Sequence, residues 1–415
     1  MDYILKYRKP EDTEGIDLPG SKSITNRALL INAMSETEAR LEGLAQCDDT
    51  YAIIDALRKA ELGHIDVGAA GTAMRFLTAY FAAMPSISLT ITGSDRMLNR
   101  PIAPLVEALR NIGAKIDYIS EEGFPPLRIE GRNLKGGHIG VRSDISSQFI
   151  SALMIIGPTL QRGLTIHLLE DSVSKTYIEM TCQIMRKFGI NAHYNNETIK
   201  IPRQSYLPPM SFDIEADWSA ASYFYEMVAL SDIDKLKLKG LQPPGKSLQG
   251  DSFLSEIYSL FGVQTSFYDN YVLIQKSDDS PKSDTPLDFN LKCCPDLVPT
   301  LAVTACLSNR QFHFKGISNL RIKECDRLHA LVVELRGLGY FLRCDADSIS
   351  WEGEKCQPNL RPIIKTYKDH RIAMAFAPAA TKIDNLVIQD AEVVRKSFPQ
   401  FWNEMRKVGI NTSLY

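Results

Sequence analysis

The sequence predicts an α/β protein in which one compact unit recurs six times, grouped three plus three into two domains. Three observations support this prediction. The length of 415 residues is roughly two to three times that of a typical domain. Strand-like and helical segments alternate along the whole chain, and six helical segments end at a glycine that precedes a strand-like run.

These glycines have the chemistry of helix C-terminal caps. Each follows an apolar-periodic helix that usually carries Arg or Lys in its last turns, as in Leu109–Gly113 and Met185–Gly189. They are spaced by about 70 to 77 residues, except for a first spacing of about 50. Chance recurrence is the alternative, because such junctions occur in any α/β protein. The six glycines are Gly63, Gly113, Gly189, Gly262, Gly339 and Gly409.

Strand candidates recur between the helices in both halves of the chain. Examples are Ser88–Thr92, Leu164–Leu168 and Asn385–Gln389. A proline-rich stretch, Pro202–Pro209, and the following Ser211–Glu215 indicate a crossing between domains near the middle.

Composition excludes several classes of protein. Apolar residues make up 44%, charged residues 23%, and the formal net charge is −3, which argues against a nucleic-acid-binding surface. The chain starts with charged residues and contains no run of about 18 apolar residues, so we expect a cytoplasmic protein that does not enter a membrane. Eight cysteines without CxxC pairs predict reduced, buried thiols. No cluster has metal-ligand spacing, so we expect neither a metal nor a cofactor.

The segment Pro19–Leu30 predicts an anion site at a helix N-terminus. Pro-Gly makes a turn, Lys22 and Ser23 open the helix, and Arg27 follows near the same face. Free backbone N–H groups and the helix dipole favour an anion there, and Arg27 could add two donors. A Walker A loop is excluded because Ser21 occupies the position where that motif needs lysine. A capped helix with a solvated lysine is the alternative.

Three further segments of the first half place polar groups before helices. Gly71 and Thr72 open one helical run, Arg96 lies in a loop before a proline-initiated helix, and Ser146-Ser147-Gln148 opens an apolar helix. Ser174 belongs to a similar but weaker pattern. A structural turn, a solvated arginine and simple capping remain alternatives at these places.

Charged residues gather in the second half at Asp296, Asn319–Arg327, Tyr367–Arg371 and Val393–Pro399. An acid before a helix, as at Asp296, is ordinarily only stabilising. A salt-bridged surface helix would explain the second segment, and a packed histidine would explain the third.

Nine motifs occur in an order that resembles the 5-enolpyruvylshikimate-3-phosphate synthase family of enolpyruvyl transferases, across nearly the whole chain. They read PGSKSITNRALL, AGTAMR, RMLNRPI, ISSQF, VSKTYIE, PDLVP, NLRIKECDRL, YKDHRIAM and VRKSFP. The resemblance implies two domains of three βαβαββ units each, an inside-out α/β barrel, with the active site in a cleft that closes on substrate. Residues 21–214 would form the first domain, and residues 1–20 and 215–415 the second.

The resemblance also implies two substrates and no cofactor. The enolpyruvyl group of phosphoenolpyruvate would pass to the 5-hydroxyl of shikimate 3-phosphate by addition and then elimination of phosphate. Asp296 would accept the hydroxyl proton, Glu324 would lie beside the methylene carbon, and Lys22 would assist phosphate departure. The residues implied for shikimate 3-phosphate are Lys22, Ser23, Arg27, Ser146, Ser147, Gln148, Ser174, Asp296, Asn319 and Lys323. Those implied for phosphoenolpyruvate are Lys22, Gly71, Arg96, Gln148, Arg327, Arg371 and Lys396.

This sequence departs from the family pattern at three places. Ala69 and Phe76 stand where the family usually has asparagine and proline, and the stretch between Gly63 and Gly68 is shorter than the usual hairpin, so the first repeat unit is predicted to be trimmed. Two rival functions stay open: the related enolpyruvyl transferase acting on UDP-N-acetylglucosamine, and a catalytically silent binder of shikimate 3-phosphate. A monomer is expected.

Overall fold

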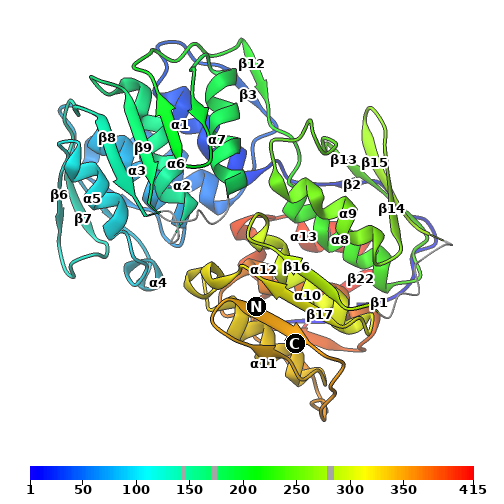
Figure 1. Cartoon of the computed structure of the whole chain (residues 1–415). Coiled ribbons are helices and arrows are strands. Elements are labelled where there is room, and N and C mark those ends of the chain that lie inside the picture. Colours follow the sequence, from blue (N-terminus) through cyan, green and yellow to red (C-terminus); the bar gives the residue numbers. More distant parts are fainter. Residues whose placement is uncertain (143–145, 170–174, 278–284) are drawn as a thin grey trace. The chain divides into compact units, whose positions relative to one another are not determined.

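The computed structural model describes residues 1–142, 146–169, 175–277 and 285–415 (Figure 1). The chain folds into two compact units. Unit 1 comprises Met1–Gly20 and Glu215–Tyr415, and unit 2 comprises Ser21–Ile214. The chain therefore crosses between the units twice, once after Gly20 and once after Ile214.

The predicted fold class is confirmed, because each unit contains three small sheets with helices between successive strands. In unit 2 the strands and helices are α1 (Lys22–Ala33), β3 (Arg40–Glu42), α2 (Asp48–Lys59), η1 (Ala60–Leu62), β4 (His64–Asp66), α3 (Gly71–Ala82), β5 (Ser88–Thr92), α4 (Asp95–Leu98), α5 (Ala103–Asn111), β6 (Lys115–Tyr118), β7 (Leu127–Glu130), β8 (Gly137–Val141), α6 (Ser147–Ile156), η2 (Gly157–Thr159), β9 (Leu164–Leu168), α7 (Lys175–Lys187), β10 (His193–Tyr194), β11 (Thr198–Ile201) and β12 (Ser211–Asp213). In unit 1 they are β1 (Tyr3–Tyr7), β2 (Ile16–Asp17), α8 (Trp218–Leu230), β13 (Lys235–Lys239), η3 (Gly250–Phe253), α9 (Leu254–Ser259), β14 (Val263–Phe267), β15 (Tyr271–Lys276), β16 (Leu287–Asn290), η4 (Pro295–Leu297), α10 (Val298–Leu307), β17 (Phe312–Lys315), η5 (Ser318–Ile322), α11 (Arg327–Gly337), β18 (Arg343–Cys344), β19 (Ser348–Trp351), β20 (Ile363–Ile364), α12 (His370–Phe376), η6 (Ala377–Thr381), β21 (Leu386–Ile388), η7 (Ala391–Lys396), α13 (Phe401–Lys407) and β22 (Ile410–Leu414).

One strand order recurs in the sheets. In β4-β5-β7-β6 the first two strands are parallel and joined through α3, and the last two form an antiparallel hairpin after α5. Sheets β8-β9-β11-β10 and β16-β17-β19-β18 repeat this order. Each of these sheets is therefore one βαβαββ unit, as the sequence predicts.

In each repeat the first helix is the more deeply buried. Eleven of the twelve residues of α3 are buried, and α1, α3 and α6 pack on one another within unit 2 (Figure 1). Helix α10 is buried along its whole length and packs against α8 and α12 within unit 1. Because α3 and α10 are buried on nearly all sides, they belong to the core of their units.

The six predicted cap glycines all have the left-handed backbone that favours glycine, with φ between 73° at Gly63 and 104° at Gly113. At Gly189 the turn is closed by two hydrogen bonds, from Gly189 N to Arg186 O and from Ile190 N to Met185 O. This Schellman arrangement satisfies the last carbonyls of α7. The repeat read from the sequence is therefore a repeated helix terminus.

The first repeat of unit 2 has a smaller sheet than the other repeats. The β12-β3 sheet has two strands, whereas the other five sheets of the described chain have four. After α2 the chain passes through η1 directly into β4, which pairs with β5 of the next unit. The hairpin that ends the other units is therefore missing here.

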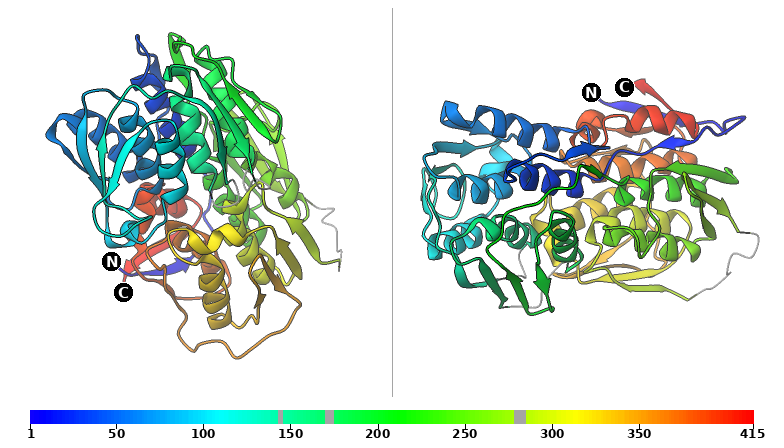
Figure 2. Two further views of the ribbon diagram at one scale, coloured as in Figure 1. Left: turned by 60° about the vertical axis from the view of Figure 1, so that its left-hand side comes forward. Right: turned by 90° about the horizontal axis from the view of Figure 1, so that it is seen from above.

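The two ends of the chain share one sheet. Strand β1 lies between β21 and β22, and residues 3–7 pair with residues 410–414 in antiparallel register (Figure 2). The first strand thus completes the last repeat of unit 1.

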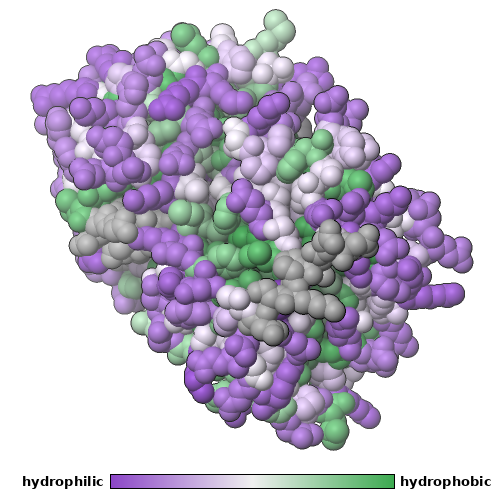
Figure 3. Space-filling view, turned by 45° about the vertical axis from the view of Figure 1, so that its right-hand side comes forward, coloured by the Kyte–Doolittle hydropathy of each residue, from purple (hydrophilic) through white to green (hydrophobic). Residues whose placement is uncertain are grey.

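One expectation about the cysteines is wrong. All eight thiols are free, but Cys293 and Cys344 are exposed rather than buried. Cys344 belongs to a short strand at the edge of its sheet, where one strand neighbour is missing. The molecular face in Figure 3 is mostly hydrophilic. Among the described residues, no helix is both long enough and apolar enough to cross a bilayer.

Candidate active site

Three helix N-termini of unit 2 carry the residues predicted from the sequence. Helices α1, α3 and α6 begin at Lys22, Gly71 and Ser147, and none has an acidic residue in its first turn. The N-termini of α3 and α6 adjoin, because Gln148 Nε2 donates to Thr72 Oγ1 at 3.1 Å. Helix N-termini without acidic caps combine their dipoles and free N–H groups in favour of an anion.

Lys22 is the first residue of α1 and is paired. Its Nζ lies 3.2 Å from Oδ2 of Asp49, a residue of the first turn of α2 whose side chain is almost completely buried. The other oxygen of Asp49, Oδ1, is buried without a hydrogen-bond partner in the described structure. Sequence reasoning missed Asp49, although the acid pair Asp48-Asp49 at the start of a helix was a visible signal.

Arg27 is a buried cation held by neutral groups. Its guanidinium donates to Thr181 Oγ1 at 2.7 Å, to Ser151 Oγ at 2.9 Å and to the carbonyl of Ser23 at 2.8 Å. Burial lowers its pKa to about 10. No carboxylate of the described chain forms an ion pair with it, so its positive charge remains available to an anion nearby.

The structure brings Arg100, rather than Arg96, against Gly71. A Cβ atom on Gly71 would clash with Nη1 of Arg100. Arg100 is buried, and its Nε has no hydrogen-bond partner among the described residues. Arg96 is exposed in the short helix α4. Arg75 holds the intervening loop by donating to the carbonyls of Gly71 and Pro101.

The remaining predicted residues of unit 2 differ in their surroundings. Ser146 caps α6 by accepting a hydrogen bond from Gln148 N at 3.3 Å. Ser147 is buried in the first turn of α6, and Ser23 is half-buried at the second position of α1. Ser174 lies outside the described residues.

Unit 1 brings most of its predicted residues into one network of ion pairs. Arg327, whose side chain is 2% exposed, donates to Asp296 Oδ1 and to Glu324 Oε2, both at 2.9 Å. Arg371 donates to Asp296 Oδ2 at 2.9 Å, and Lys396 Nζ donates to Glu324 Oε1 at 2.9 Å. The surface-helix alternative is therefore wrong for Arg327, which is enclosed by carboxylates.

Asp369 completes this network and was missed from the sequence. Its Oδ2 accepts from Arg327 Nε at 2.8 Å, and its Oδ1 caps α12 by accepting from Arg371 N. Asp369 thus connects the helix that carries Arg371 to the guanidinium of Arg327. The signal was present, because an aspartate directly before His370 is a typical helix N-cap.

Asp296 is ionised in this setting. Burial alone would raise the pKa of its carboxyl, but the positive charges of Arg371, Lys323 and Arg327 outweigh burial and bring the pKa well below its ordinary value. As long as both arginines hold this carboxylate, it is a weak base. A change in either pairing would raise its basicity.

Asn319 lies close in sequence to Lys323 and Glu324, and its side-chain oxygen is available as a hydrogen-bond acceptor. It lies in η5, four residues before Lys323, and is buried, yet its Oδ1 has no hydrogen-bond partner in the described chain. A buried amide oxygen without a donor costs free energy, unless a ligand hydroxyl or water supplies one.

Within the described residues, no group of three or more His, Cys, Asp or Glu side chains could hold a metal ion. The chemistry of both clusters is that of fixed cations, carboxylates and helix N-termini. Such groups recognise anionic substrates and transfer protons.

The three-sheet units have the two-domain fold of the enolpyruvyl transferases. The chain belongs to the EPSP synthase (3-phosphoshikimate 1-carboxyvinyltransferase) family, whose model matches residues 8–67 and 59–405. The two matched ranges overlap at residues 59–67, the part of the chain in which the first repeat lacks its hairpin. A 3-phosphoshikimate 1-carboxyvinyltransferase of Bacteroides fragilis is 47% identical over 398 residues, 95% of each chain. One of Haemophilus influenzae is 33% identical over 424 residues, 95% of this chain and 96% of the other.

Solved structures share the fold. The EPSP synthase of Acinetobacter baumannii matches with a TM-score of 0.76 at 20% identity, over 100% of both chains. The enolpyruvyl transferase NikO from Streptomyces tendae matches with a TM-score of 0.75 at 12% identity, over 99% of this chain and 98% of that one.

Proposed function

We propose that this protein is an enzyme that transfers the enolpyruvyl group of phosphoenolpyruvate to the 5-hydroxyl of shikimate 3-phosphate and releases phosphate. The observation that carries the proposal is the pairing of the ionised Asp296 with two arginines, Arg327 and Arg371. Arg327 and Arg371 also attract substrate anions. An anion that binds these arginines weakens their hold on the Asp296 carboxylate, which then becomes a stronger base. Relatives with this name span 95% of the chain, which supports the same assignment.

Unit 2 is proposed to bind the phosphate groups. Lys22 and Arg27 supply positive charge, and the N-termini of α1 and α6 supply backbone donors beside Ser23, Ser146 and Ser147. Arg27 suits this role because its protein partners are all neutral. Gln148 would contact both substrates, and Ser174 would add a hydroxyl.

The phosphoenolpyruvate side would use Gly71 together with an arginine. We propose Arg100 for this role in addition to Arg96, because Arg100 is buried against Gly71 and its Nε has no acceptor in the part of the chain that the structure describes. Ala69 cannot supply a side-chain amide here, so Arg100 would carry more of the binding.

In unit 1, Arg327, Arg371 and Lys396 are proposed to bind phosphoenolpyruvate, while Asn319 and Lys323 bind the shikimate ring. When substrate anions share Arg327 and Arg371, the pKa of Asp296 rises and its carboxylate becomes a better base. Asp296 then accepts the 5-hydroxyl proton as the oxygen bonds to the enol carbon.

The second half of the proposed reaction is proton delivery to and from the methylene carbon. Glu324, after taking a proton from water, would donate it to that carbon during addition, and the resulting carboxylate would recover a proton from the methyl group during elimination, when the C–O bond to phosphate breaks. Lys396 Nζ, 2.9 Å from Glu324, holds this carboxyl in place. Lys22 would donate a hydrogen bond to the departing phosphate.

A phosphate-release assay tests the function. Purified protein with shikimate 3-phosphate and phosphoenolpyruvate should release one phosphate per enolpyruvyl group transferred, and the Asp296→Asn variant should be slower by about a hundredfold or more. Release of phosphate from phosphoenolpyruvate only when UDP-N-acetylglucosamine replaces shikimate 3-phosphate would favour the first rival. Binding of shikimate 3-phosphate without release would favour the silent binder.

The protein is also proposed to act as a monomer in the cytoplasm. Light scattering after size exclusion should then give the chain mass of 46.5 kDa. A mass of twice this value would contradict the proposal.

A further inference from the structure

A second buried carboxyl group lies in unit 1 outside the ion-pair network. Asp251 belongs to the 3-10 helix η3, which precedes α9, and is 4% exposed. Its carboxyl is hydrogen-bonded to the hydroxyl of Ser219, in the first turn of α8. No lysine or arginine of the described chain forms a salt bridge with it, whereas Asp296, Glu324 and Asp369 all have such partners.

Hydrogen bonds of buried serine and threonine residues, one of them to the backbone carbonyl of Ser219, connect Asp251 to the helix that follows Asp296. The carbonyl of Ser219 accepts a hydrogen bond from Ser222 Oγ at 2.7 Å, and that hydroxyl lies 3.1 Å from Thr300 Oγ1. Thr300 belongs to the first turn of α10, which starts directly after η4 and Asp296. These hydroxyl-bearing residues are all buried.

An ionised carboxylate is costly in such a place. A buried charge without a cation partner loses its hydration and gains only a neutral hydrogen bond, so the neutral acid is favoured. The charged and titratable groups that act on Asp251 are Asp296 from η4, Asp217 at the N-cap of α8, Arg371 from α12 and the thiol of Cys294. Burial first, and then the negative charge of Asp296, raise the pKa of Asp251 to about 7.

We propose that Asp251 is a positioning residue for Asp296: its neutral carboxyl, bound to Ser219, ties η3 to the first turn of α8 beside α10 and leaves Asp296 as the ionised member of the pair. The catalytic part of this inference rests on the proposed function, since Asp296 matters as a base only in that reaction. The electrostatic coupling between the carboxyl groups of Asp251 and Asp296 does not depend on the proposed function. Above the pKa of Asp251, a second buried negative charge would repel an incoming anionic substrate.

The coupling can be measured without any turnover. Protein labelled with ¹³C at the aspartate carboxyl groups is titrated by NMR as wild type, Asp296→Asn and Asp251→Asn. We expect one carboxyl that titrates near pH 7, that is missing in Asp251→Asn, and that titrates at lower pH in Asp296→Asn, because the neighbouring charge is gone. A carboxyl of Asp251 that titrates near its ordinary value, or that ignores Asp296→Asn, would overturn the proposal.

A second variant keeps the test decisive if Asp251→Asn does not fold. In Ser219→Ala, Asp251 loses its hydroxyl donor, so its titration should move to higher pH. An unchanged titration in that variant would contradict the positioning contact.

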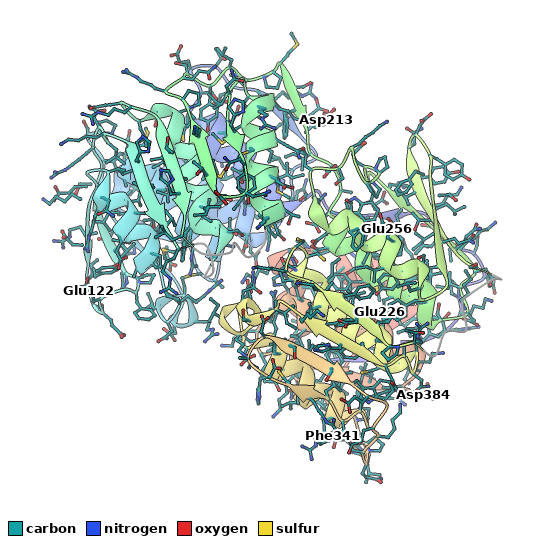
Figure 4. All side chains as sticks on the ribbon, in the orientation of Figure 1. Glu122, Asp213, Glu226, Glu256, Phe341 and Asp384 are labelled. Atoms are coloured by element: carbon teal, nitrogen blue, oxygen red, sulfur yellow. The ribbon has the colours of Figure 1, made fainter. Side chains whose placement is uncertain are left out.

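The catalytic consequence is tested by the pH dependence of kcat/KM for phosphoenolpyruvate. As the pH rises from 6 to 9, kcat/KM of the wild type should fall relative to that of Asp251→Asn by on the order of tenfold. This is the factor that corresponds to an interaction of one pKa unit between two charges. Glu226→Gln is the matched control, because Glu226 is also a buried acid of unit 1, labelled in Figure 4, and lies in α8 like Ser219 but far along the helix. Its profile should follow wild type. Parallel profiles for Asp251→Asn and wild type, or an equal change in Glu226→Gln, would overturn the proposal. If no variant turns over, the NMR result still decides the coupling, and only the proposed function fails.

Discussion

Unit 2 and unit 1 use the same repeat but give opposite chemistry to the start of its first helix. In unit 2 the residues at the N-caps of α1, α3 and α6 are Ser21, Ala70 and Ser146, none of them acidic. In unit 1 the corresponding starts carry acids, which are Asp217 before α8, Asp296 before α10 and Asp369 before α12.

This difference shows how one scaffold makes two kinds of site. A helix N-terminus without an acid keeps its N–H groups and positive dipole end for an anion. Asp217 and Asp369 satisfy such groups internally by accepting hydrogen bonds from Ala220 N and Arg371 N. Asp296 lies in η4 before α10, and its carboxylate organises the side chains of Arg327 and Arg371. Unit 2 is thereby suited to bind phosphate, and unit 1 is suited to hold carboxylates of controlled basicity.

The largest expected effect comes from the lysine at the start of α1. Lys22→Met should lower kcat/KM by on the order of a thousandfold, because one fixed cation at the phosphate is lost. Phosphate release measures this. The control is Lys59→Met in α2, whose lysine is exposed and forms an ion pair with Asp55. Near-normal turnover in Lys22→Met would show that Lys22 is not required for the reaction.

An acidic cap introduced into unit 2 should remove the difference between the helix N-termini of the two units. Ser146→Asp keeps a capping oxygen for Gln148 N but adds a negative charge at the start of α6, so KM for shikimate 3-phosphate should rise by about tenfold to a hundredfold. Ser146→Asn has the same shape without the charge. The difference between the two variants isolates the charge, and equal KM values would argue against an anion at this helix.

A stability effect should appear in unit 1 and depend on pH. Both oxygens of Glu226 are buried and have no hydrogen-bond partner among the described residues, and burial raises the pKa of the Glu226 carboxyl well above its ordinary value. A raised pKa means that the folded state holds a proton that the unfolded state has lost, so stability falls as pH rises above about 4.3, the unfolded value. Glu226→Gln should therefore exceed wild type in stability by about 1–3 kcal/mol at pH 8 but not at pH 4.

Denaturant unfolding of both proteins at the two pH values measures this effect. Equal stability differences at pH 4 and pH 8 would show that the carboxyl is not protonated in the fold.

The smallest expected effects concern the glycines that end the repeats. Gly113→Ala in unit 2 meets no atom within 4 Å, so it should cost only the strain of a positive φ, about 1 kcal/mol. Gly409→Ala in unit 1 places a Cβ against the carbonyl oxygen of Arg8 and should cost more. Denaturant unfolding separates the two, and equal losses would mean that backbone contact does not matter at Gly409.

The sequence by itself determined the fold class, the repeat and the trimmed first unit. Local signals suffice for the fold class and the repeat, because a helix terminus is recognisable from a glycine after basic residues and a strand from its alternation. The trimmed first unit followed instead from the family resemblance, because the stretch between Gly63 and Gly68 is shorter than the hairpin usual in that family. Strands Ser88–Thr92 and Leu164–Leu168 have the predicted bounds for the same reason. The ordered motifs likewise determined the family.

Only the tertiary structure decided which charges meet. The sequence could not favour Arg100 over Arg96 beside Gly71, because both arginines precede the same proline-initiated helix and only packing against α3 separates them. The pairing of Lys22 with Asp49, and the enclosure of Arg327 by Asp296 and Asp369, join positions 27 to 42 residues apart. No local periodicity encodes such contacts. They arise when helices distant in sequence pack together, α1 with α2 and the segment before α10 with α11 and α12, and the free energy of each charge depends on that burial.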